Sequence, residues 1–69
     1  MTLTQYREQA MLSIPELARR ANIDAQSVRN AEEGKRIQPR IARAIARALS
    51  EVLGQTIQPG EIEGLKVRL

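Results

Sequence analysis

The sequence contains no cysteine, no histidine, no tryptophan and no phenylalanine, and Tyr6 is its single aromatic residue. Without cysteine, the chain can form neither a disulfide framework nor a thiolate metal site. Without histidine, it lacks the side chain that most often serves as a general base or a metal ligand. No Ser, Lys or Asp has a base placed beside it by helical spacing. We therefore expect no enzymatic activity, no metal, no cofactor and no small-molecule ligand.

Long apolar runs are also missing. No stretch approaches the roughly 20 apolar residues that a membrane-spanning helix requires, and the chain does not open with a signal-peptide pattern. We expect a cytoplasmic protein without a membrane partner. The 69 residues are enough for one domain, 1–69. A chain this short buries only roughly 60% of its unfolded surface, so it needs efficient packing or association to be stable.

The positive charge is unevenly distributed. Residues 1–50 carry nine Lys and Arg against five Asp and Glu, a net charge of +4, whereas residues 51–69 carry two against three, a net charge of −1. A basic body with a nearly neutral tail suits a polyanionic partner such as nucleic acid. A basic surface that is merely solvated would give the same composition, so the charge alone does not distinguish it from a nucleic-acid-binding surface.

Apolar residues recur at helical spacing in five short segments separated by turn residues. We expect a compact all-α bundle of five helices. The segment 65–69 alternates apolar and polar residues and is interpreted as either a short strand or an ordered extended tail. The expected helices cover residues 3–11, from Ser13 to about Ala21, 25–33, from Pro39 to about Leu53, and from Pro59 to about Glu63, with a loop at 35–38.

Local signals mark the ends of the central helices. Ser13 and Glu16 have the spacing of a capping box, in which each side chain satisfies a free backbone N–H. Asn22 tolerates the left-handed conformation that often ends a helix. Asp24 is a good N-cap for the next helix, and Gly34 is a common stop signal.

The stretch 14–34 predicts a helix-turn-helix. Two short helices separated by only three residues cannot pack antiparallel, so they cross at a steep angle. Ala18 provides the small residue where the helices touch, and Ile23, Val28 and Ala31 provide apolar contacts. The outer face of the second helix then carries mainly hydrogen-bonding side chains, namely those of Gln26, Ser27, Arg29 and Asn30, beside Ala25.

Several motifs coincide at fixed spacing over residues 3 to about 53. They are Leu3-x-x-Tyr6-Arg7, Leu12-Ser13-x-x-Glu16-Leu17-Ala18-x-x-Ala21 and Ser27-Val28-x-x-Ala31-Glu32-x-Gly34, followed by a Pro and an Ala/Leu-rich helix. This pattern resembles the phage-repressor/Cro (XRE) helix-turn-helix family. The resemblance implies a lambda-repressor-like fold. It also implies a sequence-specific transcriptional regulator that binds double-stranded DNA and is associated with the nucleoid.

The resemblance also implies that residues 25–33 form a recognition helix in the major groove. Gln26 and Asn30 match the main base-reading positions, and Ser27 and Arg29 are further candidates. Gln and Asn can pair bidentately with adenine, and Arg with guanine, each worth about 1–3 kcal/mol of discrimination. The alternative is that these residues are solvated, with Arg29 paired to Glu33 at i,i+4 spacing.

Structural and phosphate-contacting roles follow from the same resemblance. Arg7 and Glu32 match an ion pair that ties the first helix to the end of the recognition helix. Lys35, Arg36 and Arg40 are expected to contact DNA phosphates. Arg40 lies in a first helical turn, where the helix dipole disfavours a cation unless an anion is near. Further along that helix, Arg43 and Arg47 are expected to form a solvated face.

The segment 50–69 carries more apolar residues than so small a core requires. These residues predict a homodimer surface, or else they close the core of the chain itself. Two other functions remain open on the same fold: an antitoxin that holds a partner protein through the tail 53–69, and a protein-interaction adaptor. Ile14, where the family usually has Gln, and the acidic Glu33 keep the adaptor open. The apolar residues are Leu53, Ile57, Ile62, Leu65, Val67 and Leu69.

Overall fold

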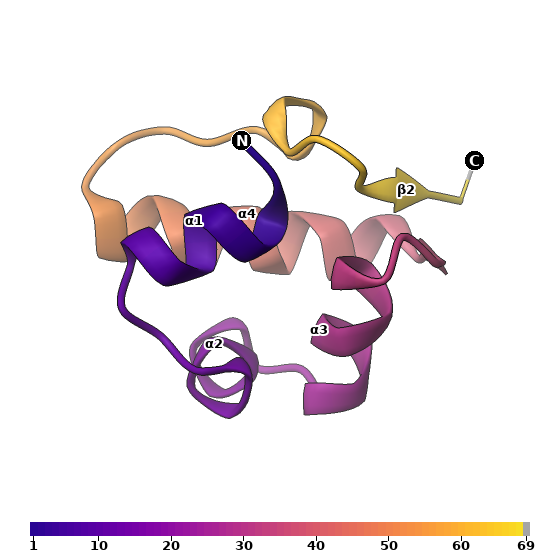
Figure 1. Cartoon of the computed structure of the whole chain (residues 1–69), viewed down its shortest axis with the longest axis horizontal. Coiled ribbons are helices and arrows are strands. Elements are labelled where there is room, and N and C mark those ends of the chain that lie inside the picture. The colour runs from indigo at the N-terminus through magenta and orange to yellow at the C-terminus, as the bar shows by residue number, and fades with distance from the viewer. Residues whose placement is uncertain (69) are drawn as a thin grey trace.

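The computed structural model describes residues 1–68, and its architecture is mostly helical (Figure 1). In Figure 1, α2 and α3 lie on one side of α4, and the C-terminal segment runs back along the other side. The predicted left-handed C-cap at Asn22 and the capping box of Ser13 and Glu16 are both present. The four helices are α1 Leu3–Gln9, α2 Ile14–Ala21, α3 Ala25–Glu32 and α4 Pro39–Leu53.

The prediction of five helices is wrong. The segment expected to form a fifth helix from Pro59 to about Glu63 contains only the 3₁₀ turn η1, Pro59–Glu61. Ile62 is extended and buried, with φ −88° and ψ 109°. The backbone N–H of Glu63 donates to the carbonyl of Met1 at 2.9 Å. This bond across the molecule takes Glu63 out of any local helical pattern.

A small parallel sheet replaces part of the expected loop at 35–38. Strand β1, Arg36–Ile37, pairs with β2, Lys66–Val67, in the register Arg36 with Lys66 and Ile37 with Val67. One backbone bond continues the ladder, because Arg68 N–H donates to the Ile37 carbonyl at 2.8 Å. Of the two alternatives for the tail, the strand is therefore the one formed. Leu69 lies outside the described residues.

Apart from Tyr6 the core is aliphatic, and it draws on residues from all along the described chain. Leu17, Val28, Ile45 and Leu49 are its largest fully buried side chains. Two apolar residues of the C-terminal segment, Ile57 and Ile62, are also buried and close the core next to α4. Leu53, Leu65 and Val67 pack against the core but stay partly exposed. No helix among residues 1–68 is long and apolar enough to cross a membrane.

Candidate nucleic-acid interface

The helix-turn-helix is formed by α2, the turn at 22–24 and α3. Its α2 helix packs against both α3 and α4. Ala18 is buried at the crossing, and its carbonyl accepts the backbone N–H of Ile23 at 2.9 Å. Val28 and Ala31 face the core and are almost fully buried. Because the inner face of α3 is used in this way, its polar residues lie on the face turned away from the core.

Two amide side chains on the outer face of α3 are joined to each other. Gln26 is exposed and Asn30 is half-buried. The Nε2 of Gln26 donates to the Oδ1 of Asn30 at 3.0 Å. This bond uses one donor and one acceptor, and the other amide atoms have no side-chain partner among the described residues. The pair therefore presents both a donor and an acceptor to an external ligand.

Ser27 and Asp24 form a separate hydrogen-bonded pair at the start of α3. The Ser27 hydroxyl donates to the Asp24 carboxylate, and this bond holds the pKa of Asp24 below its ordinary value. Asp24 is the N-cap residue, but its side chain accepts no capping bond from the backbone. Since the hydroxyl proton of Ser27 is already engaged, its oxygen is left as an acceptor.

The cations next to α3 differ in how they are neutralised. The pair between Arg29 and Glu33 that the alternative interpretation required is absent, and Arg29 is exposed without an ionic partner among residues 1–68. Glu33 instead pairs with Lys35, with Nζ and Oε1 at 3.2 Å and both side chains more than half exposed. Lys35 is thus partly neutralised within the protein, whereas Arg29 is free to meet an outside group.

Arg7 and Glu32 join α1 to the end of α3. The Nε of Arg7 lies 2.6 Å from the Oε2 of Glu32, and the side chains are only 16% and 12% exposed. Arg7 also donates to the Leu12 carbonyl at 2.9 Å, and the Thr4 hydroxyl donates to Glu32 at 2.8 Å. The carboxylate is therefore held by two side chains of α1, of which the sequence analysis identified only Arg7.

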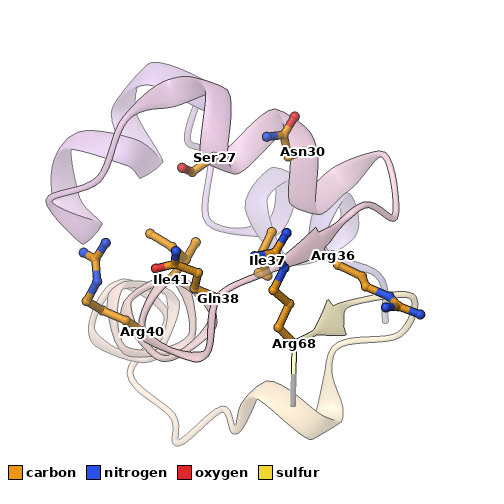
Figure 2. A pocket seen from close by; sticks show the side chains of 8 residues that line it. All are labelled: Ser27, Asn30, Arg36, Ile37, Gln38, Arg40, Ile41 and Arg68. Atoms are coloured by element: carbon orange, nitrogen blue, oxygen red, sulfur yellow. The ribbon is translucent and has the colours of Figure 1, made fainter.

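A shallow hollow of about 260 Å³ lies where α3, β1 and the start of α4 meet (Figure 2). Arg36 and Arg40 border it together with Ser27 and Asn30. The hollow therefore brings together two predicted phosphate-contacting residues and two predicted base-reading residues. Gln26, Arg29 and Lys35 do not line it.

The hollow also contains a cation that the sequence analysis missed, Arg68. Its position depends on the pairing of β2 with β1, which joins residues far apart in the chain. The alternation at 65–69 was the only sequence signal of this strand, and it did not indicate which segment would be its partner.

Exposed arginines continue along α4. Arg43 and Arg47 are exposed, as expected of a solvated face, and they border a second shallow hollow with Arg40. Of the eleven Lys and Arg residues in the sequence, only Arg7 and Lys35 form ion pairs within residues 1–68. Most of the positive charge is therefore left for solvent or an external anion.

Comparison with known protein families gives a match that covers most of this chain. A family model described as helix-turn-helix matches residues 3–54. This range runs from the start of α1 to the glycine that caps α4, so it includes α2, α3 and the basic start of α4. No match was found among curated proteins or among solved structures.

Proposed function

The chain belongs to the XRE-type helix-turn-helix family, the type found in phage repressors and Cro, and we propose that it regulates transcription by binding specific sequences in double-stranded DNA. The observation that carries this proposal is the family match over residues 3–54. It is supported by an α3 whose inner face is buried and whose outer face carries polar side chains.

In this proposal residues 25–33 act as the recognition helix and lie in the major groove. Gln26 and Asn30 read adenine through their amides, and their mutual hydrogen bond orients both side chains before DNA binds. Arg29 is exposed and has no ionic partner among the described residues, as a guanine-reading arginine requires. Ser27 contributes an acceptor.

The start of α4 and the preceding loop are proposed to hold the DNA backbone. Arg40 is the second residue of α4, whose first turn contains no acidic residue and whose N-cap makes no side-chain capping bond. The backbone N–H of Arg40, which has no partner among the described residues, and the positive end of the helix dipole favour an anion there. Arg36 adds a second cation. Lys35 contributes only after it leaves Glu33.

The ion pair of Arg7 and Glu32 is proposed to hold the recognition helix at a fixed angle. It acts at the end of α3, whereas Gln26 lies in the first turn. The charged anchor and the proposed reading residues therefore occupy different parts of the same helix. A positioning role of this kind makes no contact with DNA.

We further propose that the protein acts as a homodimer through residues 50–69. A single module makes few DNA contacts, and two half-sites about one helical turn apart would supply the missing affinity. Because Ile57 and Ile62 are used in the core, the partly exposed apolar residues left among the described residues of this segment are Val52, Leu53, Leu65 and Val67. Binding to a single and a doubled half-site, with the mass of each complex measured, tests this point.

The decisive experiment is a fluorescence-anisotropy titration against a duplex selected from a randomised pool and a scrambled duplex. Gln26→Ala should reduce the preference for the selected site by about 1–3 kcal/mol, or roughly 5- to 150-fold. Gln9→Ala is the matched control, because Gln9 is exposed on α1 and lies outside both the helix-turn-helix and the segment 50–69. Equal binding to all duplexes, or none at low salt, would overturn the proposal and favour the adaptor.

A further inference from the structure

The C-terminal segment places a cation beside the proposed DNA-binding helices. The pairing of β2 with β1 brings residue 68 next to the loop that precedes α4. The backbone bond from Arg68 to Ile37 fixes the segment at that point. In Figure 2 the Arg68 side chain rises from the tail past Ile37 in the direction of α3. Arg68 is therefore placed by the fold, although it is distant in sequence from the helix-turn-helix.

The charges around the hollow are all of one sign. Arg36, Arg40 and Arg68 border it, and none forms an ion pair within the described part of the chain. No Asp or Glu lines it. Figure 2 shows the Arg36 guanidinium directed away from the other lining side chains, so an anion that enters the hollow is attracted mainly by Arg40 and Arg68. The hollow is therefore built to favour a negatively charged group.

The remaining lining residues indicate which anion fits. Asn30 and Gln38 add neutral polar groups that can donate to an oxygen. The hollow opens between α3, proposed for the major groove, and the uncapped start of α4. A backbone phosphate at the edge of that groove lies next to both elements when α3 docks. The guanidinium fork of arginine matches phosphate oxygens bidentately.

We propose that Arg68 binds a backbone phosphate of the DNA in this hollow, together with Arg40. The inference rests on the proposed function and extends it, because it makes the strand β2 part of the DNA interface. The net charge of −1 over residues 51–69 conceals this role. Only the pairing of β2 with β1 separates Arg68 from the other charges of the tail and places it in the hollow.

The test compares Arg68→Ala with Lys66→Ala in binding titrations across a salt series. Both variants remove one positive charge from exposed positions of the same tail, but Lys66 does not line the hollow. Losing one phosphate contact reduces the slope of log K against log salt by about 0.9. Between 50 and 200 mM salt, the unmodified protein should therefore lose about three- to fourfold more affinity than Arg68→Ala does. Lys66→Ala should keep the original slope.

A second measurement locates the contact on the DNA. Single phosphates of the selected duplex are replaced in turn by uncharged methylphosphonates. One replacement should weaken binding by the unmodified protein more than it weakens binding by Arg68→Ala, in which Arg40 alone of the two arginines is left to contact that phosphate. Arg68→Lys should partly restore the salt slope. Thermal unfolding followed by circular dichroism checks that each variant is folded, and the backbone bond to Ile37 does not require the arginine side chain.

The outcomes separate this inference from the proposed function. If the unmodified protein binds no duplex, the proposed function itself fails. If it binds selectively while Arg68→Ala and Lys66→Ala weaken binding equally, the effect is one of net charge and the inference is overturned. The same conclusion follows if folded Arg68→Ala keeps the original salt slope and the same phosphate profile.

Discussion

The two helices of the helix-turn-helix have the same length but differ in how the side chains at their N-termini are hydrogen-bonded. Both α2 and α3 contain eight residues. In α2, Ser13 and Glu16 cap the N-terminus reciprocally, with bonds of 2.8 and 3.2 Å. Hydrogen bonding from Ser13 to the Glu16 carboxylate, chiefly from the Ser13 backbone N–H, also holds the pKa of Glu16 below its ordinary value. In α3, the side chain of Asp24 bonds to Ser27 instead of the backbone.

Under the proposed function, this difference distinguishes the supporting helix α2 from α3, the helix proposed to contact DNA. The start of α2 is satisfied by the chain itself, and so is the start of α1, where Thr2 and Gln5 form a capping box. The starts of α3 and α4 have no side-chain capping bond to the backbone. These two helices also line the hollow that contains Arg68. Polar groups at a helix start that lack a side-chain partner within the chain can bond instead to a ligand.

The largest expected effect is a loss of stability when the ion pair that joins the end of α3 to α1 is removed. Glu32→Ala leaves Arg7 largely buried without its partner, and we expect a loss of about 3 kcal/mol in the free energy of unfolding. Urea denaturation followed by circular dichroism measures it. Glu33→Ala, at the exposed neighbouring position, is the control and should change stability by less than about 1 kcal/mol. Equal effects of the two variants would show that the anchor contributes nothing special.

A smaller effect should distinguish the two N-caps directly. Ser13→Ala removes a capping acceptor from α2 and should cost about 1 kcal/mol. In a domain of this size, that loss lowers the melting temperature by roughly 4–8 °C. Asp24→Ala should cost clearly less, because no backbone N–H of α3 depends on its side chain. If calorimetry gives the two variants equal melting temperatures, the proposed contrast between α2 and α3 is wrong.

The smallest effect should be a gain in DNA affinity. Glu33→Gln removes the exposed carboxylate that pairs with Lys35. In the proposed complex, this carboxylate would repel the DNA backbone. Affinity should rise roughly 1.5- to 5-fold at low salt, in line with the energy of an exposed ion pair, and the gain should fade as salt increases. Glu8→Gln is the matched control, since Glu8 is exposed on α1 and lies outside both the proposed DNA interface and the segment 50–69. An unchanged affinity in Glu33→Gln would place Lys35 outside the interface.

The features predicted well from sequence were those determined by neighbouring residues. The capping box of Ser13, the left-handed Asn22 and the limits of α4 at Pro39 and Leu53 all depend on local chemistry. The first helix ended earlier than expected, at Gln9, because Met11 adopts a left-handed conformation with φ 58°.

The features missed were those determined by distant residues. The sheet requires residues 36–37 to meet residues 66–67, and neither segment is long enough to reveal a strand by itself. The position of Arg68 depends on that pairing. Local spacing also suggested the wrong partner for Glu33, because Lys35 in the following loop competes with Arg29. The apolar residues of the tail likewise did not indicate by themselves which of them would be buried in the core and which would stay partly exposed.

The parallel pairing of β1 with β2 has a consequence for the order of folding. The strands lie about thirty residues apart in the chain, so their pairing closes a long loop that contains all of α4. Closing such a loop costs more chain entropy than forming the short turn between α2 and α3. Two strands of only two residues each form few backbone hydrogen bonds to offset that entropy loss. We therefore expect the tail to dock last during folding and to open first in native-state hydrogen exchange, so that the strand proposed to complete the DNA interface is also the most transient part of the protein.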